Sequence, residues 1–205
     1  MLQTTANFDS INAASYVEVE DTNAGNVPPN LLSACSGSNP ATDAPSKQIT
    51  VQAPGVNGIV SSSEVSTQCG TDSTCILPAG TTLRVDTNLN LGALLVRGGV
   101  EWTDSTQLDA SAFICAGYVA VEGQGKWEMD LQTKTAYIYL KDNGATHHTL
   151  RTRAFGGHAE NFGEDNPTID IKGREMKRTW SLLSQPLSQG DVEMRLMHDP
   201  NLMEW

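Results

Sequence analysis

Residues 94–98 read LLVRG, residues 119–123 read VAVEG and residues 169–173 read IDIKG, so one short pattern occurs three times. In each copy two apolar residues at alternate positions are followed by a glycine. Alternation with a period of two is typical of a half-buried β-strand, and the glycine indicates a corner where the backbone takes positive φ. The glycines are 25 and then 50 residues apart. This self-similarity predicts strands stacked into a solenoid, and an ordinary β-sandwich or barrel is the alternative.

The chain from residue 76 onward has the pattern of an all-β protein. Short apolar runs recur, and few windows of ten residues or more show a helical apolar stripe. We therefore predict an all-β fold over residues 76–187, namely a β-solenoid or right-handed parallel β-helix-like module. If the first two copies are neighbouring rungs, Val96 and Val121 should lie about 4.8 Å apart on adjacent strands.

Residues 1–75 have a different composition, rich in Pro, Ser, Thr, Asn and Ala. Residues 16–19 and 49–52 are expected to form short strands, and the three serines at 61–63 a turn or linker. We predict an irregular Pro- and Ser-rich arm against the solenoid, or the end of a preceding domain. Disorder is the simplest alternative, and Cys35 is the main argument against it.

The charge balance narrows the classes of partner. The chain has 13 Lys and Arg against 24 Asp and Glu, for a net charge of −11. This balance argues against binding to nucleic acid and against a polybasic membrane-surface protein. No run of 18 apolar residues occurs, so we expect no membrane span. The first residues lack the basic and apolar regions of a signal peptide, so either none exists or the chain begins after one.

Four cysteines give a prediction about covalent state and location. Cys69 and Cys75 flank a polar turn that a disulfide could close, and their spacing is not that of a zinc site. Cys35 and Cys115 could then join the arm to the repeat. Three connectivities are possible, and four reduced thiols in a cytosolic protein are the alternative. We predict Cys69–Cys75 and Cys35–Cys115 disulfides and an extracellular or cell-surface location. No Asn-x-Ser/Thr acceptor is present, so any glycans of such a glycoprotein would be O-linked.

The order of the glycine motifs resembles one family. Residues 77–81 read LPAGT, the first two copies of the repeat follow, and the third copy precedes RTWSLL at 178–183. Together these resemble the eight-glycine (G-eight) domain of fibrocystin-like proteins, hyaluronan-binding cell-migration proteins and protist and algal cell-surface proteins. Glycines stand where the family pattern has them at Gly80, Gly92, Gly98, Gly99, Gly123, Gly125 and Gly173. The resemblance implies an extracellular β-rich module with a link to carbohydrate.

The resemblance continues at the end of the chain. A strand expected at residues 192–196 and Trp205 look like the start of the β-helix coils that follow the module in these proteins. Residues 188–205 are therefore expected to begin a further β-helix region, and the chain to be a fragment of a longer polypeptide.

Polar residues are most concentrated in residues 143–167. His147, His158 and Glu160 are candidate metal ligands there. His147 and His148 would point to opposite faces if they were neighbours on a strand, so both could not easily bind one ion. The alternative is a polar, solvated insertion between coils.

Tryptophans and basic residues are the candidates for carbohydrate binding. Trp102 and Trp127 would form a platform for sugar rings if exposed, whereas the inward alternative, which we favour, puts them in the core. The candidate basic patch for an anionic glycan consists of Lys172, Arg174, Lys177 and Arg178.

Carboxylates give two weaker hypotheses. Glu122 and Glu128, with Asp130 nearby, could form a glycosidase pair, although exposed strand carboxylates are common in an acidic protein. Aspartates near turns at 86, 104 and 109 make calcium a candidate cofactor, although turn-forming aspartate is the common case.

The prediction for function is a structural or adhesive module of a larger extracellular protein. It would act through other domains of the same chain, neighbouring subunits or polysaccharide. The alternative is a fragment of a polysaccharide-binding or polysaccharide-degrading β-helix protein. Because no complete catalytic constellation is recognisable, whether the chain is an enzyme stays uncertain, and we favour a non-catalytic role.

Overall fold

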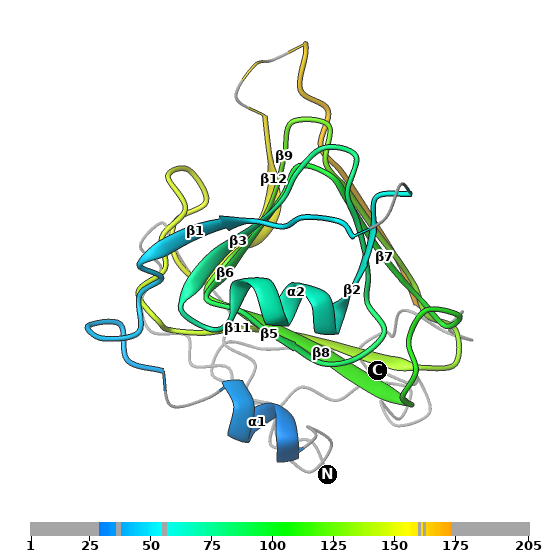
Figure 1. The fold of residues 1–205 in the computed structure, drawn as a ribbon, viewed down its shortest axis with the longest axis horizontal. Coiled ribbons are helices and arrows are strands. Elements are labelled where there is room, and N and C mark those ends of the chain that lie inside the picture. Colours follow the sequence, from blue (N-terminus) through cyan, green and yellow to red (C-terminus); the bar gives the residue numbers. More distant parts are fainter. Residues whose placement is uncertain (1–28, 36–37, 55–56, 160, 162, 174–205) are drawn as a thin grey trace, which may run out of the picture. The chain divides into compact units, whose positions relative to one another are not determined.

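The structure, a computed structural model, describes residues 29–35, 38–54, 57–159, 161 and 163–173, all within one compact unit. Its strands form three sheets in which every pair of neighbours is parallel. Figure 1 shows the sheets as the three sides of a triangle, with successive turns of the chain stacked along the line of sight. The fold is a parallel β-helix, which confirms the predicted all-β class. Among the residues just given, no helix is long and apolar enough to cross a bilayer.

Each turn contributes one segment to each side of the triangle. Sheet A contains β1 (Lys47–Thr50), β3 (Ser73–Leu77), β6 (Ala93–Val96), β9 (Val119–Glu122) and β12 (Phe155–His158). Sheet B contains β2 (Ile59–Ser61), β4 (Thr82–Arg84), β7 (Gly99–Thr103), β10 (Lys126–Asp130) and β13 (Thr168–Lys172). Sheet C contains β5 (Leu89–Asn90), β8 (Ser111–Ala116) and β11 (Thr135–Leu140).

The register confirms the first two copies of the repeat and corrects the third. Val96 pairs with Val121 across neighbouring strands of sheet A. The copy at 169–173 lies in sheet B instead, where β13 pairs with β10. Every strand of a β-helix alternates inward and outward residues, so the pattern alone does not distinguish one face from another. The sheet A strand of that turn is the glycine-containing β12, after a long loop at residues 141–154.

Two glycines show why this residue recurs at the corners. Gly123 has φ +59, the left-handed conformation that the pattern predicts. Gly98 does not have positive φ, but a Cβ atom there would overlap the carbonyl oxygen of Thr81 on the preceding turn. Close approach of stacked turns therefore selects glycine at Gly98, and backbone conformation selects it at Gly123.

The solenoid begins before the boundary predicted at residue 76, because β1 pairs with β3 and β2 with β4. Helix α2 (Ser62–Cys69) takes the place of the sheet C strand in this first turn, and it lies across the triangular cross-section in Figure 1. Its Val65 and Cys69 are buried in the main core. The serines interpreted as a turn or linker thus start a helix that covers one end of the solenoid.

Both predicted disulfides are present. Cys35, the last residue of α1 (Pro29–Cys35), is bonded to Cys115 in β8, with Cα atoms 5.8 Å apart. Cys69, at the end of α2, is bonded to Cys75 in β3. The first bond fastens the segment before the solenoid to sheet C, and the second fixes the covering helix to sheet A.

Candidate functional site

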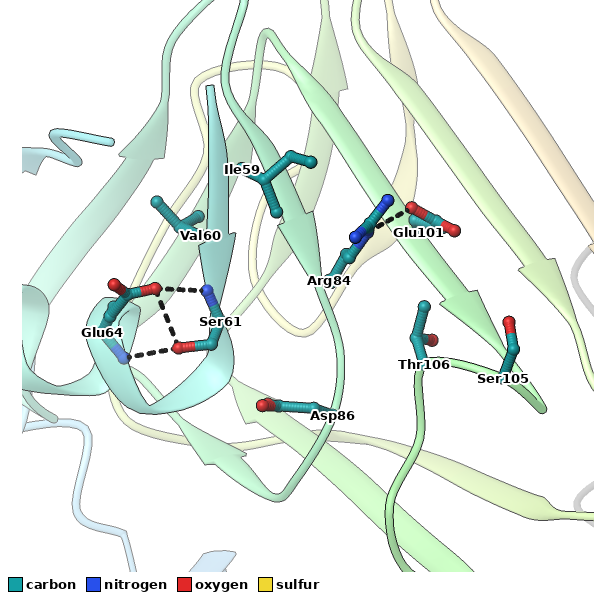
Figure 2. Close-up of a pocket in the computed structure, with 9 residues that line it drawn as sticks. All are labelled: Ile59, Val60, Ser61, Glu64, Arg84, Asp86, Glu101, Ser105 and Thr106. Atoms are coloured by element: carbon teal, nitrogen blue, oxygen red, sulfur yellow. Dashed lines mark hydrogen bonds and ion pairs between the residues drawn. The ribbon is translucent and has the colours of Figure 1, made fainter. Parts of the chain in front are cut away.

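A cleft of about 480 Å³ lies on the outer side of sheet B, beside the start of α2. Figure 2 shows its walls, which come from β2, β4 and β7, from α2 and from the turn after β7. The residues that line it are Ile59, Val60, Ser61, Glu64, Arg84, Asp86, Glu101, Ser105 and Thr106. Three carboxylates, one guanidinium and several hydroxyl groups therefore face a shared space over a small apolar area.

Each carboxylate in the cleft has protein partners. Glu64 accepts hydrogen bonds from the backbone N–H and the hydroxyl of Ser61, at 2.7 and 2.9 Å, in the capping box that begins α2. The Asp86 Oδ1 atom accepts the backbone N–H of Ser62 at 3.0 Å. Glu101 pairs with the Arg84 guanidinium at 2.9 Å (Figure 2). These contacts fix the orientation of the acidic groups without removing all their lone pairs.

The polar groups that line the cleft are carboxylates, hydroxyl groups and one guanidinium. Among the described residues that line it there is no histidine, cysteine or lysine, so the carboxylates are the groups there that could act as a base or nucleophile. The hydroxyls of Ser61, Ser105 and Thr106 are held by hydrogen bonds to neighbouring residues, as the carboxylates are. Oxygens fixed in this way can hydrogen-bond the hydroxyl groups of a ligand through their remaining lone pairs. The volume falls in the range of ligand clefts in proteins.

A second polar site lies on the outer side of sheet A. Three of the four histidines of the chain meet there, with ring centres 4.3 Å apart for His147 and His148 and 5.0 Å for His148 and His158. His147 and His148 lie in the 141–154 loop and His158 in β12. The loop is not a strand at this point, so the alternation that was expected to separate the two neighbouring rings does not apply.

The start of the 141–154 loop is packed against the sheet, which corrects the solvated-insertion alternative for this part of it. The Asn143 side-chain amide donates to the Gly92 carbonyl at 2.9 Å. Ala145 packs against Tyr118 and its neighbours in a second, smaller apolar cluster outside sheet A. The backbone of the loop is therefore held firmly where His147 begins the histidine cluster.

His147 joins this loop to a buried carboxylate. Its Nδ1 atom accepts the backbone N–H groups of Leu150 and Thr149, at 3.0 and 3.3 Å. The proton must then be on Nε2, which donates to Glu122 Oε1 at 2.8 Å. Because both ring nitrogens are occupied, His147 is not available as a general base in this arrangement.

Glu122 is ionised because of its partners. The Arg97 guanidinium lies 3.1 Å from Glu122 Oε2 and is half exposed, whereas the Glu122 side chain is almost fully buried. Burial alone would raise the pKa of the Glu122 carboxyl, but the hydrogen bonds from His147 and Arg97 outweigh burial and lower that pKa. The result is a fixed anion at the base of the histidine cluster.

The predicted metal ligands are partly brought together. His147 and His158 both belong to the cluster, with ring centres 5.8 Å apart. Glu160 lies outside the described residues, and the carboxylate found beside the rings is Glu122. Sequence reasoning missed this assignment because Glu122 precedes His147 by 25 residues, and only the stacking of turns brings the two together.

The tryptophans proposed as a sugar platform are core residues. Trp102 and Trp127 are fully buried, with ring centres 6.4 Å apart in an edge-to-face arrangement. Trp102 donates its indole N–H to Gln107 at 2.8 Å. A stacking platform needs an exposed ring face, so this burial corrects the platform hypothesis and agrees with the inward alternative.

Of the predicted basic patch, the structure describes only Lys172. Lys172 is exposed on β13 and pairs with Asp170 at 2.8 Å. The other members lie outside the described residues: Arg174, Lys177 and Arg178.

The carboxylates considered for a glycosidase pair or for calcium binding interact with neighbouring protein groups. Glu128 pairs with Lys126 on sheet B, whereas Glu122 belongs to sheet A, so each carboxylate has its own cation. Asp104 accepts backbone N–H groups from the turn at residues 132–134. The oxygens of Asp104 therefore stabilise a turn, which is the common structural role of aspartate.

No family model, no curated protein and no solved structure matches the chain.

Proposed function

We propose that the chain is a non-catalytic module of an extracellular or cell-surface protein, and that the cleft on sheet B is its contact surface. The observation that carries the proposal is the state of the cleft's charged groups: Glu64, Asp86 and Glu101 each have fixed protein partners. The two disulfides support an oxidising environment for the mature protein. The resemblance to G-eight domains belongs to the same proposal, and its corner glycines are consistent with stacked turns.

The chemistry of the cleft favours a polyhydroxylated ligand without negative charge. Its lining has three carboxylates against one guanidinium, on a chain with a net charge of −11. Coulomb repulsion therefore disfavours uronic acids such as those of hyaluronan, pectin and alginate. A neutral or amine-bearing polysaccharide can donate hydroxyl or ammonium hydrogens to the carboxylates and cover Ile59.

The proposal is tested by screening the chain on neutral, cationic and anionic polysaccharides, with and without calcium. The double variant Arg84→Ala/Glu101→Ala removes a charged pair from the wall of the cleft. We expect at least tenfold weaker binding to the best neutral or cationic polymer. The matched control is Lys126→Ala/Glu128→Ala, which removes an exposed pair from the same sheet outside the cleft residues.

Two results would contradict the proposal. Equal binding by the two double variants would move the contact surface away from the cleft. Degradation of any of these polymers by the purified chain would favour the polysaccharide-degrading alternative. Glycosidases use pairs of carboxylates, so the three carboxylates in this cleft are a reason to measure such activity.

A further inference from the structure

The histidine cluster is unusual in this chain for its composition. Histidine is rare here, with four copies in 205 residues, yet three of them share one site on the outer side of sheet A. The site also holds Glu122, a buried carboxylate. The cleft on sheet B does not include any of these residues.

We propose that His148, His158 and Glu122 bind a divalent transition-metal ion, with His147 as the residue that positions Glu122. Imidazole nitrogens and a carboxylate oxygen are the ligand set that Zn²⁺, Cu²⁺ and Ni²⁺ prefer, whereas Ca²⁺ prefers an all-oxygen set. The proposal therefore differs in ligand chemistry from the calcium suggested by the aspartates near turns.

The ring geometry fits two imidazoles on one ion. Ligating nitrogens lie at roughly 2.1 Å from Zn²⁺, so two rings at a tetrahedral angle have centres about 5 Å apart. The centres of His148 and His158 are 5.0 Å apart, and their planes meet at 77°. Ligand atoms of Glu122, His147 and His148 all lie within 4.8 Å of one another. His158 Nε2 lies 3.3 Å from the Thr149 hydroxyl, so the proposal requires this ring nitrogen to exchange that partner for the ion.

His147 has a different role because of its tautomer. Its Nδ1 atom is occupied by two backbone N–H groups, which keeps the proton on the nitrogen that faces Glu122. A ring in this state can bind a metal only by giving up its backbone hydrogen bonds at Nδ1 or by moving the proton away from Nε2. It can hold Glu122 Oε1 in place, and a carboxylate oxygen that accepts one hydrogen bond retains a lone pair for the ion.

The surroundings provide charge and access. Arg97 and His147 keep Glu122 ionised and fixed in position. His148 is exposed, so an ion can reach the site directly from solvent. The acidic character of the chain increases the local concentration of cations.

The test uses the full chain and titrates Zn²⁺ and Cu²⁺ by calorimetry and native mass spectrometry. We expect one ion per chain, with Ca²⁺ at equal concentration failing to compete. His148→Ala and His158→Ala should each weaken binding at least tenfold, and Glu122→Gln should do the same. Two matched controls, Thr146→Ala in the same loop and Glu128→Gln in the neighbouring sheet, should bind as the wild type does.

The Cu²⁺ electron paramagnetic resonance spectrum tests the role of His147. We expect coupling to two nitrogens in the wild type, and the same spectrum in His147→Gln, which retains a donor for Glu122. Three nitrogens that become two in His147→Gln would overturn the positioning role. Binding that persists undiminished in the His148→Ala/His158→Ala double variant would overturn the site itself, with circular dichroism confirming that the variant is folded.

Discussion

An inner strand and a terminal strand of the described solenoid have the same alternating pattern with opposite results. In β9 the alternating residues Val119 and Val121 are fully buried, whereas in β13 Ile171 is 51% exposed. At the first turn α2 covers the core and a disulfide holds it there. At the last described turn, β12 and β13 each pair with one neighbouring strand among the described residues. Alternation therefore determines which way a side chain points, and coverage by a further layer determines whether it is buried.

The largest expected effect comes from testing this difference with matched aliphatic truncations. Leu77→Ala, at a fully buried position of β3, should lower the free energy of unfolding by about 3 kcal/mol, because it leaves a cavity in the core. Ile171→Ala, on exposed β13, should change it by less than about 0.5 kcal/mol. Urea unfolding of both variants measures the difference. Similar losses in the two variants would show that β13 is as well covered as β3.

A buried cation gives the next prediction, for alkaline pH. Lys141 follows β11 and donates to the Asn90 side chain at 2.9 Å. Burial lowers the pKa of Lys141 from 10.5 to about 8, although the charge of Asp43 partly opposes this. Between these two values the unfolded chain binds more protons than the folded chain. The free energy of unfolding should therefore rise with pH from 8 to 10.5, by at most about 1.4 kcal/mol per pH unit.

Urea unfolding at pH 7.5, 8.5 and 9.5 measures this rise. The variant Lys141→Met keeps most of the packing and removes the titrating group, so its stability should be flatter over this interval. The exposed Lys47, paired with Asp72 at 3.5 Å, provides the control Lys47→Met. A rise that is unchanged in Lys141→Met would mean that another group is responsible.

A smaller effect is expected at the covering helix. Ser61 is the N-cap of α2, and it exchanges hydrogen bonds with Glu64 in a capping box. Ser61→Ala should cost about 1 kcal/mol, because backbone N–H groups at the start of the helix lose their acceptor. Ser66→Ala, at an exposed position further along the same helix, is the control. Thermal unfolding followed by circular dichroism compares the two, and equal midpoints would contradict the role of the cap.

The smallest effect is local and concerns the 141–154 loop. Because the pKa of Glu122 is lowered in the folded state, its stabilising contribution is present above about pH 4.5 and is lost as the pH falls through the folded value. Acidification should therefore weaken the hydrogen bond between His147 and Glu122, and with it the attachment of the loop to sheet A. The hydrogen-exchange protection factors of the Thr149 and Leu150 amides, which correct for the slower intrinsic exchange in acid, should fall at low pH in the wild type. In Glu122→Gln the exchange should be fast already at neutral pH, and slow exchange there would contradict this account.

Particular residues show what the sequence could and could not predict. The all-β fold class could be predicted from residues 94–98 and 119–123. Apolar side chains at every second position are characteristic of a β-strand and have few other physical explanations. Helix α2 was missed because it has eight residues, of which only Val65 and Cys69 are apolar and buried in the core. The spacing of Ser61 and Glu64 was the one signal for it.

The sites were harder to predict than the fold. The histidine cluster depends on which residues stack above one another, and a repeat of variable length does not fix that from sequence. The cleft depends on the lateral placement of β2, β4 and β7 with α2. Cysteine pairing was the exception. The short polar turn between Cys69 and Cys75 favoured a disulfide between them, and Cys35 and Cys115 were then the remaining pair.

The position of the cross-links also determines how the molecule would respond to a pulling force. All four cysteines of the chain lie at or before residue 115. A pull on the C-terminal side would therefore detach β13, β12 and then the turn of β9 to β11, with no covalent bond to stop it. The turn from Val119 to the start of β12 at Phe155 has 36 residues, and it releases roughly 120 Å of contour length at ~3.4 Å per residue. Tension would then reach the Cys35–Cys115 bond, which shields the intervening turns from extension. The solenoid would therefore unfold turn by turn from its C-terminal side, and unfolding would stop at this disulfide.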